Sequence, residues 1–140
     1  SLFGGIALTN AGLGAAHGFA APIGGMFPAP HGAVCAALLP HVMAANIRAL
    51  RERAPDGNAL RRYGEIGQLL TGKTTATPDE GVKWVGELVA ELGIPRLSSY
   101  GIEKTHVGEL TEKASSASSM KGNPIVLTAE ELVDVLDAAI

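Results

Sequence analysis

The first third of the sequence has no acidic or basic side chain. No Asp, Glu, Lys or Arg occurs from residue 1 to residue 47, whereas the whole chain has 11 Lys and Arg and 14 Asp and Glu. Because soluble domains normally carry charges over their whole exterior, this run must lie in lipid, in a core, or against another part of a protein. Asn10, three histidines and four prolines interrupt it, so we expect no clean membrane span. We expect a helical core that also presents a face to a partner.

The sequence has only one cysteine, no excess of positive charge and no recognisable signal peptide. The single cysteine, Cys35, cannot form an internal disulfide, and no basic segment followed by an apolar one marks a signal peptide. This pattern favours a cytoplasmic location. A net charge of -3 and a pI near 5.8 provide no basic surface for a phosphate backbone. Neither a nucleic acid nor a membrane is expected as a partner.

The length of 140 residues suits one domain. The chain starts at Ser1 rather than at Met and leads directly into the apolar segment LFGGIAL. We therefore expect residues 1–140 to form a single all-helical domain that is a fragment of a longer protein.

Two helices have clear start signals in the last two thirds of the chain. Thr77, Pro78 and Glu80 form a capping box with proline at the first helical position, and apolar residues then recur at helical spacing until Gly93. Thr128 begins a terminal helix in the same way, after an extended lead over 125–127. Further helices are expected over 58–70 and 104–115.

The uncharged segment predicts shorter helices over 1–11, 13–21 and 32–39, with a new helical turn at His41 after Pro40. Its many glycines each cost about 0.5–1 kcal/mol in a helix relative to alanine, so we expect close backbone approach to another helix or to a ligand. No stretch alternates between apolar and polar residues as a half-buried strand does. The predicted fold class is all-α.

His17 and His31 are the strongest candidates for chemistry. Thirteen residues separate them, and both have small or apolar neighbours. Neutral imidazoles in such surroundings suit a divalent metal, but this spacing is not specific. The alternative is two core histidines, each bonded to a backbone carbonyl. Two histidines cannot complete a tetrahedral site, and no carboxylate precedes Glu52, so further ligands would come from elsewhere.

Other motifs carry less weight. Gly12-Leu13-Gly14 followed by Gly18 resembles a dinucleotide loop, but neither the preceding strand nor the following acidic residue is present. Cys35 is interpreted as an inert buried thiol, since no cation lies near it in sequence. His41 is interpreted as a packing residue and His106 as a solvated helix residue.

The segment NAGLGAAHGFAAPIGGMFPAPHGAVCAALLPHVMAAN, residues 10–46, resembles the signature region of the iron-dependent (group III) alcohol dehydrogenases. It has a histidine in a glycine-rich helix, a GG turn, a PHG and then LPHVM followed by Asn. The closing segment MKGNPIVLTAEELVDVLDAAI also resembles that family. The resemblance implies the helical C-terminal domain of the dehydroquinate synthase-like fold. It also implies that an N-terminal α/β domain, which binds NAD or NADP, is missing from this chain.

By this resemblance, His17 and His31 are metal ligands, while an Asp and a His come from the missing domain. Many relatives have a second histidine four residues after the first, near the nicotinamide. Ala21 stands at that position here and is assigned to the substrate pocket. The resemblance implies iron, or zinc as in some relatives, as the metal, and does not identify catalytic or cofactor-binding residues in this chain.

The implied function is interconversion of alcohols with aldehydes or ketones by metal-assisted hydride transfer to NAD or NADP. The alternatives are a maleylacetate reductase or glycerol dehydrogenase on the same scaffold, or a non-enzymatic helical module. A homo-oligomer is left open. Because only two ligands are counted in the chain itself, we expect the isolated chain to be inactive and to bind metal weakly or not at all.

Overall fold

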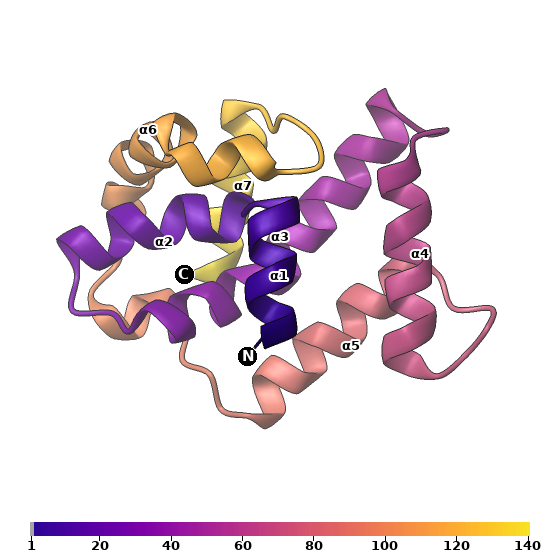
Figure 1. The fold of residues 1–140 in the computed structure, drawn as a ribbon. Coiled ribbons are helices and arrows are strands. Elements are labelled where there is room, and N and C mark those ends of the chain that lie inside the picture. Colours follow the sequence, from indigo (N-terminus) through magenta and orange to yellow (C-terminus); the bar gives the residue numbers. More distant parts are fainter. Residues whose placement is uncertain (1) are drawn as a thin grey trace.

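The computed structural model describes residues 2–140, except for the side chain of Ala7, and Ser1 of the predicted first helix lies outside this range. Figure 1 shows the arrangement of the helices. The helices are α1 (Leu2–Ala11), α2 (Ala15–Met26), α3 (His31–Arg53), α4 (Asn58–Thr71), α5 (Pro78–Glu91), α6 (Val107–Ser116) and α7 (Ala129–Ala139), with short 3-10 turns at Leu97–Tyr100, Lys104–His106 and Ser118–Gly122. No strand occurs within the described residues, so the predicted all-α fold class is confirmed.

The predicted helix starts agree with the structure where capping residues are present. The Thr77 hydroxyl accepts a hydrogen bond from the backbone N–H of Glu80, and the Glu80 carboxylate accepts one from the backbone N–H of Thr77. Thr128 and Glu131 form the same reciprocal pair at the start of α7. These bonds satisfy backbone donors that a helix end otherwise leaves unpaired.

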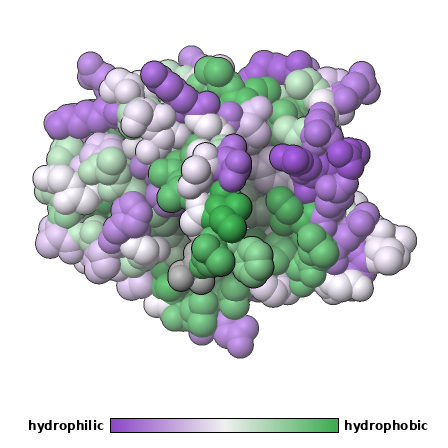
Figure 2. Space-filling view, in the orientation of Figure 1, coloured by the Kyte–Doolittle hydropathy of each residue, from purple (hydrophilic) through white to green (hydrophobic). Residues whose placement is uncertain are grey.

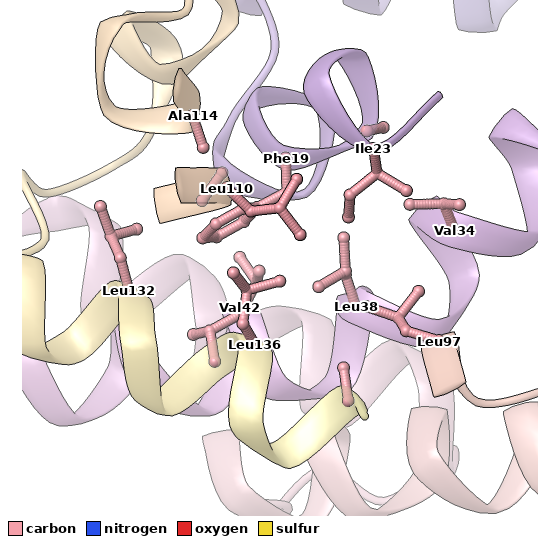
Figure 3. Close-up of a cluster of buried hydrophobic side chains, with 14 of the residues drawn as sticks. Phe19, Ile23, Val34, Leu38, Val42, Leu97, Leu110, Ala114, Leu132 and Leu136 are labelled. Carbon is pink, nitrogen blue, oxygen red and sulfur yellow. The ribbon is translucent and has the colours of Figure 1, made fainter. Parts of the chain in front are cut away.

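The core lies where α2, α3, α6 and α7 meet. Figure 3 shows Phe19 and Ile23 of α2 facing Leu38 and Val42 of α3, with Leu110 and Leu136 closing the cluster. All six side chains are buried, and none is more than 5 % exposed. The uncharged segment therefore supplies much of the core, as expected. Helices α4 and α5 pack on each other, and α5 also contacts α3.

The predicted break at Pro40 is wrong, because α3 continues through Pro40 to Arg53. A proline inside a helix removes one backbone hydrogen bond, but α3 buries residues on both sides of it, including Leu38 and Val42. Burial of these side chains outweighs the lost bond. The predicted end of α2 near residue 21 is also wrong, since that helix continues through Pro22 and the Gly24-Gly25 pair to Met26. The pair is helical and does not form a turn.

The uninterrupted α3 also overturns the expectation that no span-length helix exists. By length and composition alone, His31–Arg53 could cross a membrane. However, 61 % of its most apolar window is buried inside the described fold, as in the core helix of a soluble protein. Its apolar character is therefore explained by its place in the core.

Helix α1 is the part of the uncharged segment that does not enter the core. Its large apolar side chains are exposed, with Phe3 at 85 % and Leu2 at 73 %. Figure 2 shows hydrophobic residues gathered at the centre of the face on which α1 lies in Figure 1. An apolar face of this kind is typical of a surface that meets another protein part.

Close backbone approach explains only some of the glycines. A Cβ on Gly18 would meet the Met120 side chain at 2.7 Å, and a Cβ on Gly14 would meet Asn123 Oδ1 at 3.0 Å. Gly24, Gly25 and Gly32 have open space instead. The chain itself therefore does not require these three to be glycine.

Candidate metal centre

His17 and His31 come together although they lie on different helices. His17 is on the first turn of α2, and His31 is the first residue of α3. The two helices pack against each other, and their imidazole rings have centroids 5.3 Å apart at an interplanar angle of 55°. The structure thus brings the two predicted ligands into one site.

Cys35 is the third member of this cluster. Its Sγ lies 3.6 Å from His31 Nε2, and one potential ligand atom from each of His17, His31 and Cys35 lies within 4.8 Å of the other two. Among the described residues, no other group of His, Cys, Asp and Glu side chains forms such a cluster.

The cluster is accessible rather than sealed in the core. His31 is exposed, while His17 and Cys35 are half-buried. Within residues 2–140, neither imidazole donates a hydrogen bond to a backbone carbonyl. The alternative of two carbonyl-bonded core histidines therefore does not describe this pair.

The donor chemistry fits a divalent transition metal. Imidazole nitrogen and thiolate sulfur are ligands for zinc, cobalt and iron, whereas magnesium and calcium prefer oxygen. Partial burial raises the pKa of the Cys35 thiol. The cluster offers at most three donors, so a tetrahedral ion there needs at least one further ligand.

Sequence reasoning missed the position of Cys35. The available signal was its spacing from His31, since residues four apart on a helix lie on the same face. The predicted burial of Cys35 is wrong, because this residue is half-buried. Its Sγ lies beside a predicted metal ligand, His31, and the inertness of the thiol stays a prediction.

Ala21 follows His17 by four residues on α2 and is exposed. It therefore lies one helical turn from His17 on the same side of the helix. This placement excludes the alternative that Ala21 is a core residue. Its assignment to a substrate pocket stays a prediction.

The other two histidines lie outside the cluster. His41 is half-buried, and burial together with Arg96 lowers its pKa. His106 lies in the 3-10 turn Lys104–His106 and is half-buried, so its solvation is partial. Its ring packs edge-on against Phe27 at 5.0 Å, and its Nδ1 accepts a hydrogen bond from the Glu103 backbone N–H.

The glycine motif near residue 12 is not a dinucleotide loop. The element before Gly12-Leu13-Gly14 is the helix α1, whereas such a loop follows a strand. Gly12 has a positive φ of 72° and turns the chain from α1 into α2.

Comparison with known proteins identifies relatives of the whole chain. Residues 1–140 match the profile described as Fe-containing alcohol dehydrogenase family, C-terminal. The chain is 34 % identical over 136 residues to alcohol dehydrogenase 4 of Saccharomyces cerevisiae, covering 96 % of this chain and 34 % of that protein. It is 32 % identical over 136 residues to lactaldehyde reductase of Escherichia coli, covering 96 % of this chain and 35 % of that protein.

Solved structures show the same fold. An iron-containing alcohol dehydrogenase from Thermococcus thioreducens superposes with a TM-score of 0.73 at 30 % identity, over 96 % of this chain and 34 % of that one. A 1,3-propanediol oxidoreductase superposes with a TM-score of 0.79 at 24 % identity, over 97 % of this chain and 35 % of that one. The chain spans about one third of the length of these relatives. It belongs to the iron-containing alcohol dehydrogenase family and corresponds to the helical C-terminal region of that family.

Proposed function

We propose that this chain is the metal-binding helical domain of an NAD(P)-dependent oxidoreductase that interconverts alcohols with aldehydes or ketones by hydride transfer. The observation that carries the proposal is the convergence of His17 and His31 on one accessible site, in a chain of the iron-containing alcohol dehydrogenase family.

His17 and His31 would hold a divalent ion, either iron or zinc. When bound, such an ion supplies Lewis acidity toward the oxygen of an alcohol or carbonyl substrate. The role of this chain is to fix the two imidazoles. Since both helices that carry them pack in the core, the histidines are held by rigid elements.

The exposed apolar face of α1 supports a second part of the proposal. Leu2, Phe3 and Ile6 are at least half exposed, and a nucleotide-binding domain that covered them would bury this face. That domain would bind most of the NAD or NADP and supply further metal ligands. Packing of two apolar surfaces excludes water from a cleft between them, which favours hydride transfer over side reactions.

The substrate is proposed to be a small alcohol or its carbonyl counterpart. The names of two relatives specify lactaldehyde and 1,3-propanediol. Ala21 favours keeping a maleylacetate reductase or a glycerol dehydrogenase as a second candidate, because this exposed position lacks the histidine that many relatives have. Substrate profiling separates these activities. A cytoplasmic location and a homo-oligomeric state stay predictions.

The test is alcohol-dependent reduction of NAD+ and NADP+ by the full-length protein that carries this chain. We expect His17→Ala and His31→Ala to lower kcat/KM by at least about 100-fold, since loss of a ligand removes the Lewis acid. His106→Ala is the matched control and should retain activity, because its ring lies outside the cluster. Unchanged turnover in His31→Ala would show that the ligand assignment of His31 is wrong. No alcohol-dependent reduction of NAD+ or NADP+ by the wild type would show that the proposed activity is wrong.

A further inference from the structure

Cys35 lies beside the two histidines but has no part in the function proposed above. We propose that Cys35 is a third metal ligand of this site, so that the domain itself offers two imidazole nitrogens and one thiolate sulfur. This inference rests on the proposed function in one respect, namely that His17 and His31 hold a metal.

The distance between Cys35 and His31 fits a shared ion. In the 140-residue chain alone, a tetrahedral ion held by the two histidines, Cys35 and one water has nitrogen at about 2.0–2.1 Å and sulfur at about 2.3 Å, which sets these two ligand atoms about 3.6 Å apart. The observed separation of Sγ and Nε2 is 3.6 Å. A weak hydrogen bond between thiol and imidazole produces a similar distance, and titration with Co2+ distinguishes the two.

The helix presents both side chains to the same point. Since His31 and Cys35 are four residues apart on α3, they project from one face, and His17 reaches the same point from α2. The three ligand atoms already lie within 4.8 Å of one another. Because an ion binds these donors at about 2.0–2.3 Å, the three ligand atoms would draw closer together around it.

The third donor changes both affinity and selectivity. Binding converts the thiol to a thiolate and releases one proton to solvent. A ligand set that includes a thiolate binds zinc and cobalt in preference to hard cations such as magnesium. Zinc also binds more tightly than ferrous iron to the same nitrogen and sulfur ligands. With two histidines alone, we expect the isolated chain to bind metal weakly or not at all. With Cys35 as a third ligand, we expect this chain alone to bind a metal ion specifically.

Titration of the reduced 140-residue chain with Co2+ tests the inference without any activity assay. A thiolate ligand produces a sulfur-to-cobalt charge-transfer band in the near ultraviolet, whereas the visible d–d bands report bound cobalt whatever its ligands. We expect both in the wild-type chain, and Zn2+ should abolish both by displacement. Because these bands are measured on the wild-type chain, the result does not depend on whether a variant folds.

Two variants assign the bands. Cys35→Ser should lose the charge-transfer band, keep the d–d bands and bind Co2+ at least about 10-fold more weakly. His106→Ala, the matched control, should keep both bands. Visible bands without a charge-transfer band in the wild type would overturn the ligand role of Cys35 while leaving the histidine site standing. No visible bands in the wild type would overturn this inference, and the same result with the full-length protein would overturn the proposed function as well.

Discussion

The crossing of α4 and α5 offers a sharp test of packing, through substitution of Gly67 by alanine. A Cβ at Gly67 would lie 2.5 Å from the Thr77 carbonyl oxygen and 3.2 Å from the Thr77 carbonyl carbon. Both are backbone atoms, so they cannot yield as a flexible side chain can. The Thr77 oxygen also accepts the first backbone hydrogen bond of α5, from Gly81. The added methyl must therefore separate the helices or distort the start of α5.

Two opposing effects set the magnitude. Overpacking costs about 1–3 kcal/mol, and replacing glycine by alanine inside a helix gains about 1 kcal/mol. Because the clash is with backbone, we expect the upper end of the cost and a net loss of about 2 kcal/mol. For a chain of this length the loss lowers Tm by roughly 4–8 °C.

The matched control is Gly64→Ala on the same helix. No atom lies within 4 Å of a Cβ at Gly64, so this variant should keep only the propensity gain of up to about 1 kcal/mol. Thermal unfolding followed by far-ultraviolet circular dichroism measures both variants. If Gly67→Ala were as stable as Gly64→Ala, the close approach of α4 to α5 would be wrong.

Three further predictions concern the interior, the α7 cap and the pocket. Asn123→Ala should lower the free energy of unfolding by about 2–4 kcal/mol in chemical denaturation. It removes the hydrogen bonds of Asn123 to Asn46, Ala15 and Ile125, so the buried Asn46 side chain loses hydrogen-bond partners. A decrease of less than about 0.5 kcal/mol would contradict this network. The hydrogen bonds from Arg53 lower the pKa of Glu131 from 4.5 in the folded chain. The Glu131 carboxylate therefore stabilises the fold above pH 4.5, and this contribution is lost as the pH falls through the lower folded pKa. Glu131→Gln should flatten this part of the stability–pH curve, and an unchanged slope would contradict the role of Glu131. In the full-length protein, Ala21→His should alter the pH dependence of kcat or narrow the substrate range at unchanged metal content, because an imidazole titrates near neutral pH. A large fall in Tm with an unchanged pH profile of kcat would show that Ala21 does not line the substrate pocket.

Local capping chemistry made several helices predictable from sequence. The Thr77 and Thr128 boxes specify their helix starts through short-range bonds, and both are present in the structure. The path of the uncharged segment was not predictable in this way. Pro40 and the Gly24-Gly25 pair disfavour a helix locally, but α2 and α3 gain more from burying Phe19, Ile23 and Leu38 than they lose at these positions. Such a balance depends on distant residues.

The candidate site shows the same division. A resemblance to relatives pointed to His17 and His31, and the packing of α2 on α3 brings them together. The resemblance does not point to Cys35, and the signal available for it is its spacing of four residues from His31. The fold then brings His17 of α2 to the same point.

The central claim is that His17 and His31 hold a metal ion, and the metal content of the purified full-length protein tests it most directly. Elemental analysis should find about one ion per chain in the wild type and in His106→Ala, and less than about a tenth of that in His17→Ala and His31→Ala, since each loss removes a ligand. Full metal content in a correctly folded His31→Ala variant would contradict the claim.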